Sequence, residues 1–479
     1  MYTFELFLLH RPFPIRVCLH SGTLDSKMQL LFSLATCLLA AVVQAQNTSY
    51  ASLQQGNTIA TEGLVANTSR YNTILRVDNG TYGPAIEEVH YFYKYWPVGI
   101  AVSSTGRLFV SYTRGSYDYT LGEVVNMTAE TPYPDAGTNL PPSELNTTFN
   151  TIPFGSANQT GLISVQALYV TPNTSDGRPE TLWLLDTGRP TIDSTTPSGV
   201  ATQIMPYAQP GGAKVVGISL ANNSIYATYT FPPSVHFPDS YMNDIRFDLR
   251  PGRNVAYIVD SSNEGRTGFI MLNLTDGTSW RRLTQHPSTL RVYNDVPSYQ
   301  GHPFYYRIPG MPLSHQQEGL DGIQITPDGN YIYYSPINSR YLYRVSTAAL
   351  LVTDDDSYLA EQAASNNVTN LGQRGAEANG FEGDNNGLIY MCMPENNALY
   401  YYDPNDLQVH GFVRDPRIIW PDGMTIGADG YAYMMINQLP YQGGWNNNVG
   451  GNLGLREWPG AILRAKLNNG GKKITTLWS

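Results

Sequence analysis

The chain has 479 residues, of which 42% are hydrophobic and 14% are charged, and its formal net charge is −10 at pH 7. An acidic surface with few charges argues against nucleic acid and anionic membranes as partners. We therefore expect the partner to be a small-molecule substrate. Of three cysteines, Cys18 and Cys37 lie near the N-terminus and only Cys392 lies in the long remainder. One cysteine cannot form an internal disulfide, so the hydrophobic core must stabilise the fold by itself.

The stretch "MQLLFSLATCLLAAVVQAQ" (Met28 to Gln46) has an apolar core of signal-peptide length that ends in Val43-Gln44-Ala45. This pattern predicts a secretory signal peptide over residues 28–45, which places the protein in the secretory pathway or outside the cell and away from the membrane after cleavage. A type II signal anchor is the alternative. Residues 1–27 are then a mis-called start or an extension, because the signal begins at an internal Met.

Ten Asn-x-Ser/Thr sequences follow the signal. Such a density, combined with a signal peptide, predicts a glycoprotein of the secretory pathway, although an Asn-rich chain also produces some of these sequences by chance. The candidate glycosylation sites are Asn47, Asn67, Asn79, Asn126, Asn146, Asn158, Asn173, Asn222, Asn273 and Asn367.

After an N-terminal segment over residues 46–90, one pattern recurs six times: an alternating strand, a Gly- or Asn-rich turn and a more hydrophobic strand. The units begin near Lys94, Gly161, Tyr241, Gly319, Glu377 and Ile418. Six hairpin units predict an all-β fold, a six-bladed β-propeller over residues 91–479, whose inner strands line a central channel. The only convincing helical segment is Ser346 to Asn366.

The repeats align a column of polar residues at the start of the inner strands. Asp321, Asn379 and Asp422 each precede a Gly and lie seven residues before a turn residue, and Asn243 with Asp244 holds the same place in another unit. Val98 and Gln166 fill it in the first two units. Such side chains would converge on the propeller axis. The alternative is turn chemistry, since Asp-Gly and Asn-Gly are ordinary turn pairs.

Four stretches carry a resemblance to a known family: "WPVGIAVSSTGRLFVS", "MNDIRFDLRPGRNVAYIVDSS", "GLDGIQITPDGNYIYYSPINSRYLYRVST" and "WPDGMTIGADGYAYMMINQL". Together they resemble the yellow/major royal jelly protein family. The resemblance implies a secreted six-bladed propeller with a ligand-binding channel. The chain lacks the cysteines of the insect members, which suggests a fungal branch. There it is similar in size and kind to the hetero-Diels-Alderases of fungal tropolonic sesquiterpenoid pathways, which join a tropolone quinone methide to a humulene-type alkene.

A cycloaddition needs neither a covalent nucleophile nor a metal, because holding two partners in a reactive arrangement lowers most of the barrier. The residues expected to orient the tropolone oxygens or assist loss of water are Asn243, Asp321, Asn379 and Asp422. The apolar walls expected beside them are Trp96, Phe381, Trp420 and Met424, each of which could instead be blade packing. The long insertion from His286 to Gly319 could cap the channel and carries His302 and His315, which are possible acid/base groups or ordinary surface residues.

Two other functions stay open. A calcium-dependent lactonase would use oxygen ligands such as Asn243, Asn379, Asp422 and Glu318; otherwise no cofactor is expected. A secreted carrier would bind its ligand in the same channel without reaction. A serine hydrolase is not indicated: Gly217, Ser219 and Ala221 imitate a nucleophile elbow, but the helix that must follow the serine is not present in the pattern.

Overall fold

The computed structural model describes two compact units, over Met1–Asn79 and Gly80–Ser479. The described residues are 78–113, 115, 117–139, 161–195, 201–208, 211–306, 312–353, 357–443 and 454–478, with short strands at 3–6, 15–18, 147–149 and 152–154. In the first unit, β1 (Thr3–Leu6) pairs antiparallel with β2 (Ile15–Cys18). The predicted signal peptide and Asn47, Asn67, Asn146 and Asn158 lie outside the described residues. No helix among the described residues is long and apolar enough to cross a membrane.

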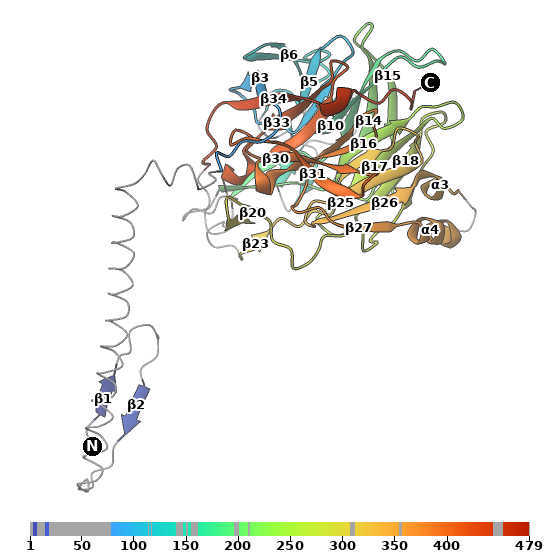
Figure 1. Ribbon diagram of the computed structural model, residues 1–479. Helices are drawn as coiled ribbons and strands as arrows, with labels where there is room; N and C mark the ends of the chain where they lie inside the picture. The colour runs from blue at the N-terminus through green and yellow to red at the C-terminus, as the bar shows by residue number, and fades with distance from the viewer. Residues whose placement is uncertain are drawn as a thin grey trace, which may run out of the picture. The chain divides into compact units, whose positions relative to one another are not determined.

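The second unit is the predicted six-bladed propeller: six four-stranded antiparallel sheets form a ring (Figure 1). Blade 1 contains β4 (Gly99–Val102), β5 (Leu108–Ser111), β6 (Leu121–Asn126) and β7 (Ala129–Pro132). Blade 2 contains β10 (Val165–Thr171), β11 (Thr181–Asp186), β14 (Lys214–Ser219) and β15 (Ser224–Thr230). Blade 3 contains β16 (Met242–Asp248), β17 (Val255–Asp260), β18 (Gly268–Asn273) and β19 (Ser279–Arg282).

The other three blades follow the same order from the axis outward. Blade 4 contains β24 (Leu320–Ile325), β25 (Tyr331–Pro336), β26 (Tyr341–Ser346) and β27 (Thr369–Gln373). Blade 5 contains β28 (Phe381–Gly383), β29 (Ile389–Met393), β30 (Ala398–Asp403) and β31 (Gln408–Arg414). Blade 6 contains β32 (Pro421–Ile426), β33 (Tyr431–Ile436), β34 (Gly460–Lys466) and, as its outermost strand, β3 (Ile86–Phe92).

The ring is closed by the strand that precedes the first blade. β3 pairs antiparallel with β34, from Ile86 opposite Ala465 to Phe92 opposite Gly460. The expected propeller start at residue 91 therefore falls inside a strand of blade 6, and the compact unit begins at Gly80. Sequence reading placed the boundary later because β3 has no hairpin partner next to it in the chain.

Short helices, hairpins and 3-10 turns connect or flank the blade strands. The expected helical segment forms two helices, α3 (Thr347–Leu350) and α4 (Ser357–Asn366). Small hairpins among the residues that the structure describes are β8 (Thr147–Phe149) with β9 (Ile152–Phe154), β12 (Ile192–Thr195) with β13 (Ala201–Ile204), β20 (Ser298–Tyr299) with β21 (His302–Pro303), and β22 (Tyr305–Tyr306) with β23 (Ser314–His315). The described residues also form 3-10 turns at η1 (Pro394–Asn396), η2 (Leu439–Tyr441) and η3 (Asn468–Gly470).

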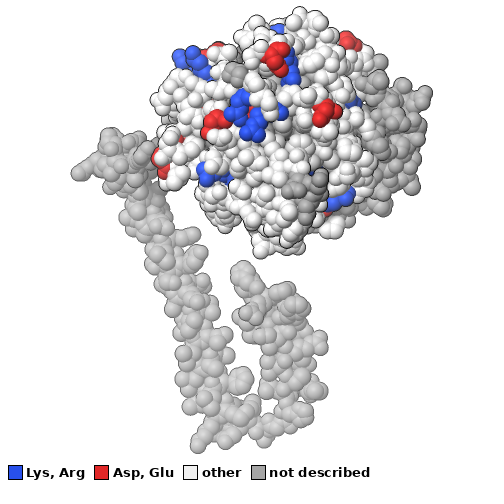
Figure 2. Space-filling view, turned by 90° about the vertical axis from the view of Figure 1, so that its right-hand side faces the viewer, with Lys and Arg blue, Asp and Glu red and all other residues white. Residues whose placement is uncertain are grey.

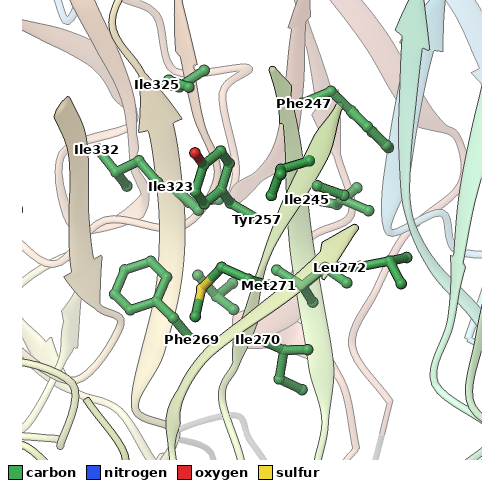
Figure 3. Close-up of a cluster of buried hydrophobic side chains, with 14 of the residues drawn as sticks. Ile245, Phe247, Tyr257, Phe269, Ile270, Met271, Leu272, Ile323, Ile325 and Ile332 are labelled. Atoms are coloured by element: carbon green, nitrogen blue, oxygen red, sulfur yellow. The ribbon is translucent and has the colours of Figure 1, made fainter. Parts of the chain in front are cut away.

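The core lies between neighbouring blades. Every residue of β11 and β17 is buried, because the second strand of a blade is covered by another blade on each face. This explains their nearly continuous apolar sequences, whereas the outer strand β15 alternates and is largely exposed. One cluster joins blades 2 to 4 (Figure 3): Phe247 of β16 packs on Trp183 of blade 2 with ring centroids 4.9 Å apart, and Phe269 of β18 packs on Tyr334 of blade 4 at 5.0 Å. Ser219 ends strand β14 and is followed by a turn, so no helix forms the elbow of a serine hydrolase.

Charged side chains are sparse on the face in Figure 2, and blue and red groups lie next to each other. Several outer-blade charges are paired in this way, such as Arg464 with Glu87 at 2.7 Å and Arg417 with Glu88 at 2.7 Å. Five of the six described candidate glycosylation sites are exposed, namely Asn79, Asn126, Asn173, Asn222 and Asn367, and Asn273 is partly exposed. Their glycosylation remains a prediction.

Candidate functional site

The six inner strands each place one residue of the predicted column around the axis, at the same end of the propeller. Val98, Gln166, Asn243, Asp321 and Asp422 line one cavity, and Asn379 Nδ2 lies 3.4 Å from Asp422 Oδ1. The cavity has a volume of only about 40 Å³. This is room for a few water molecules, whereas pockets that bind drug-sized ligands measure about 300–1,000 Å³. A larger ligand must therefore bind above the cavity, at the mouth of the channel.

Arg246 limits the depth of this cavity. Its guanidinium reaches from blade 3 to Gln324 Oε1 of blade 4 at 2.8 Å and to the carbonyl oxygen of Phe381 in blade 5. It also pairs with Asp244 Oδ1 at 2.7 Å. The side chain thus spans the axis, and its bonds to three blades keep the lower channel closed.

The Gly that follows each polar residue allows the backbones of neighbouring blades to lie close together. A Cβ on Gly423 would lie 2.9 Å from the carbonyl oxygen of Val98, and one on Gly380 would lie 2.9 Å from that of Asp422. Such contacts are too close for any side chain. The turn lies seven residues further on, where Gly430 has φ +78°. The turn interpretation of these Asp-Gly and Asn-Gly pairs is therefore wrong, and their side chains do converge on the axis.

Two amides hold Asp422, the acid of the Trp-Pro-Asp-Gly stretch. Asn437 Nδ2 donates to Asp422 Oδ2 at 2.6 Å, and Asn379 Nδ2 approaches Oδ1 at 3.4 Å. The Oδ1 atom of Asn379 is buried without a hydrogen-bond partner. A rotation of this amide by half a turn would present that oxygen to a protonated Asp422, which could then donate to it. The arrangement can therefore serve both protonation states of the carboxyl.

A second chain of hydrogen bonds lies on the other side of the axis. Tyr241 donates to Gln166 Oε1 at 2.7 Å, and Gln166 Nε2 donates to Asn243 Oδ1 at 3.0 Å. Asn243 Nδ2 continues to Ser261 Oγ at 3.2 Å. These bonds fix the orientation of the amides that blades 2 and 3 contribute to the ring.

The axial carboxyls retain their protons at unusually high pH. Burial raises the pKa of Asp422 to about 7, although Asn437 and the charge of Arg456 oppose the shift. Burial, and then the charge of Asp422, raise the pKa of Asp321 well above its usual value. Burial also raises the pKa of Asp244 to about 6, against the effect of Arg246. A carboxyl that is protonated near neutral pH can donate a hydrogen bond or a proton to a ligand.

The four expected apolar walls occupy three kinds of place. Phe381 and Met424 line the axial cavity. Trp420 is fully buried, has φ +57°, and packs against Phe304 with ring centroids 5.0 Å apart, so it is a packing residue. Trp96 occupies the same place in the first Trp-Pro pair, yet it lies partly exposed against Trp458, with centroids 4.2 Å apart. The same Trp-Pro pair is therefore buried in one blade and partly exposed in another.

The long insertion is anchored at the end of the propeller that carries the column. Ser298 donates to Glu395 Oε1 at 2.7 Å through its backbone, and Phe304 packs on Trp420 of blade 6. His302 is exposed, and His315 is partly buried with Nδ1 2.6 Å from the carbonyl oxygen of Gln316. Neither histidine lines the axial cavity. The structure thus gives no support to the two histidines as acid/base groups.

The C-terminal segment covers the opposite end of the propeller. It contacts the inner hairpins of successive blades: Asn385 donates to the carbonyl oxygen of Lys472 at 2.9 Å, and Leu249 to that of Leu477 at 2.8 Å. Trp478 is buried and belongs to the core cluster of blades 2 to 4. Because this segment covers the far end, a ligand would reach the column from the other mouth.

The comparisons with known proteins agree with the motifs. The sequence model described as "Major royal jelly protein" matches residues 177–468, more than half of the chain. The chain belongs to the major royal jelly protein family. The family resemblance read from the motifs is thereby confirmed. No curated protein matches the sequence.

Royal jelly family membership is accompanied by distant structural likeness to enzymes. A luciferin-regenerating enzyme has 10% identity and a TM-score of 0.44, covering 82% of this chain and 97% of that one. A streptogramin B lyase has 14% identity and a TM-score of 0.42, covering 81% and 98%. A gluconolactonase from Xanthomonas campestris has 10% identity and a TM-score of 0.38, covering 82% and 99%. At these values the likeness carries no argument about activity.

Two of the candidate calcium ligands, Asn243 and Asp422, line the axial cavity of this royal jelly family member, but they are bonded to different neighbours. Asn243 is bonded to Gln166 and Ser261, whereas Asp422 is bonded to Asn437 on the other side of the axis. Among the described residues, no three His, Cys, Asp or Glu side chains are arranged to hold a metal ion. The calcium-dependent alternative stays a prediction, and no step of the chemistry below uses a metal.

Three residues of the site were not predicted from the sequence: Arg246, Asn437 and Tyr241. Asn437 directly follows the apolar strand β33, and a polar residue at the end of an inner hairpin was the available signal. Arg246 lies inside the alternating strand β16, where a charged residue on the buried face was a sign of an axial position. Nothing in the sequence near Tyr241 separates it from the many other tyrosines.

Proposed function

We propose that this protein is an enzyme acting on a small oxygen-bearing molecule, and specifically a hetero-Diels-Alderase that joins a tropolone quinone methide to a humulene-type sesquiterpene. The observation that carries the proposal is the Asp422 carboxyl, which lines the axial cavity between the amides of Asn437 and Asn379 and whose pKa burial raises to about 7. The tropolone class itself comes from the family resemblance. The channel residues supply the physical reasons why such chemistry would work here.

Asp422 would generate the reactive diene. In its protonated form it donates a proton to the hydroxyl of a hydroxymethyl tropolone, the carbon–oxygen bond breaks, and water leaves. The tropolone hydroxyl then returns a proton to the carboxylate, so the site is unchanged and no electrons are supplied. The product of this loss is the quinone methide. A well-placed proton donor of this kind contributes roughly 10²–10⁴-fold to the rate.

The ring closure itself would follow from positioning. The oxygen and the exocyclic carbon of the quinone methide form one carbon–oxygen and one carbon–carbon bond to the alkene, and every atom of both partners is retained. Phe381 and Met424 are buried beside Asp422 and form an apolar lining of the axial cavity beneath the reactants. The cavity of about 40 Å³ holds water only, so the two reactants lie above it. Excluding bulk water there would also protect the quinone methide from hydration.

The test compares product formation by the wild-type protein with that of Asp422→Asn, which keeps the shape of the side chain and removes the proton. We expect the wild type to accelerate adduct formation from the hydroxymethyl tropolone and to fix its stereochemistry, and the variant to lose at least about 10²-fold of the acceleration. The matched control is Asp406→Asn, an exposed acid on blade 5, which should react like the wild type.

The outcomes separate the alternatives. A wild-type protein that binds the tropolone without changing the rate or the stereochemistry of the adduct is a carrier, and the enzymatic proposal falls. Acceleration that survives in Asp422→Asn removes this carboxyl from the mechanism. Acceleration that a chelator abolishes would instead favour the calcium-dependent alternative.

A further inference from the structure

An arginine lies at the mouth of the channel beside two tryptophans. The guanidinium carbon of Arg456 lies 4.9 Å from the ring centroid of Trp96. The ring of Trp96 is stacked on that of Trp458, with a centroid distance of 4.2 Å and an interplanar angle of 10°. Trp458 is 44% exposed, so this stack lies at the surface. Packing a guanidinium against an indole limits its motion and leaves its N–H groups available in their own plane.

The position of Arg456 is tied to that of Asp422. Arg456 Nε donates to the carbonyl oxygen of Gln438 at 3.4 Å, and the preceding residue, Asn437, donates to Asp422. The side chain of Gln438 in turn holds the backbone of Glu457, accepting from its N–H at 3.0 Å and donating to its carbonyl oxygen at 2.8 Å. Two consecutive residues at the end of β33 therefore carry the cation and the axial acid into the same mouth.

Several arginines of the propeller pair with a carboxylate, whereas others in the part of the chain that the structure describes, including Arg456, do not. Arg464 pairs with Glu87, Arg417 with Asp415 and Arg281 with Asp260, whereas among the described residues no carboxylate forms an ion pair with Arg456. Burial lowers its pKa to about 10, so it is still charged near neutral pH. A cation held away from bulk water without a carboxylate in contact is costly, and an anionic ligand would offset that cost.

We propose that Arg456 and the Trp96–Trp458 stack form a subsite for a planar conjugated oxyanion. The fork of N–H donors matches two oxygens held in one plane, as in a tropolonate or an aromatic carboxylate. The indole supports the guanidinium from one side, and the ligand ring lies at its edge, toward Asp422. The choice of tropolone as the ligand rests on the proposed function; the recognition of a planar oxyanion does not.

The test is direct binding of tropolone to the purified protein, measured by calorimetry at about pH 8, where tropolone is ionised. Tropone, which has the same ring but no acidic hydroxyl, is the matched neutral ligand. We expect tropolone to bind at least about 10-fold more tightly than tropone, and Arg456→Gln to remove this preference. Arg456→Lys keeps the charge without the planar fork, and should lose most of it. Arg253→Gln, at an exposed arginine of blade 3, is the control.

Each outcome decides the inference. Equal binding of the two ligands, or a preference that survives in Arg456→Gln, overturns it, provided the variant unfolds at the same urea concentration as the wild type. A preference lost in Arg456→Gln supports it even if the protein accelerates no reaction, in which case the proposed function falls and the subsite stands. Benzoate, added as a second planar anion, separates a general oxyanion site, which it would occupy, from one that needs adjacent ring oxygens.

Discussion

The protonated state of Asp422 predicts how the stability of the protein depends on pH. Its pKa is about 7 in the folded state and returns to about 3.8 on unfolding. Between these values the folded protein binds more protons at this site than the unfolded chain. The free energy of unfolding must therefore fall as the pH rises through this range, which is the opposite of the usual behaviour of an ion-paired acid. Asp422→Asn removes this contribution.

The size of the effect follows from the shift. Each pKa unit corresponds to about 1.4 kcal/mol, so a shift from 3.8 to about 7 sets an upper limit of about 4 kcal/mol on the loss of stability from this group. Asp422 is only partly covered and touches the water-sized cavity. Because water there solvates the charge, we expect about 2 kcal/mol. Asp321 has a raised pKa for the same main reason and adds a slope of the same sign.

The assay is urea unfolding at about pH 5 and about pH 8, followed by tryptophan fluorescence. The wild type should lose stability between the two conditions, and Asp422→Asn should lose about 1 kcal/mol less, because the part of the effect below pH 5 lies outside this range. Asp406→Asn, whose acid is exposed and has a lowered pKa, should keep the wild-type fall. If Asp422→Asn falls as steeply as the wild type, the carboxyl is ionised throughout and its role as a proton donor is refuted.

Two predictions concern the framework of the site. Gly423→Ala should destabilise the fold by about 1–3 kcal/mol, because the new Cβ would lie 2.9 Å from the carbonyl oxygen of Val98. Gly454→Ala, at a position with open space around it, is the control and should not destabilise the fold. Equal urea midpoints for the two variants would contradict the close approach of the blades. Trp478→Ala should lower the free energy of unfolding by about 3–5 kcal/mol, because the indole is buried in the core. Tyr358→Ala, whose side chain is 67% exposed, is the control. An unchanged urea midpoint for Trp478→Ala would show that the C-terminal segment does not hold the far end closed.

The repeated pattern predicted the fold because each unit carries its own local signal. The hairpin turns with Gly at positive φ and the axial Gly after a polar residue both recur, so six units and the column of Asp321, Asn379 and Asp422 could be read directly. What depends on contacts between distant segments could not be read. The closing strand β3 has no local partner, and the Trp-Pro pairs look alike although Trp420 is buried and Trp96 lies at the mouth.

The charges of Asp422 at the axis and Arg456 at the rim act on each other, and this coupling predicts an order of events at the site. The charge of Arg456 lowers the pKa of Asp422, although burial outweighs it. An oxyanion bound at Arg456 would cancel that charge, so the pKa of Asp422 would rise and the acid would stay protonated at a pH where the empty site has begun to lose its proton. Binding of the first reactant would thus prepare the proton donor beside it. The same logic explains why the cation has no carboxylate partner: a permanent counter-ion there would occupy the donors that the ligand needs.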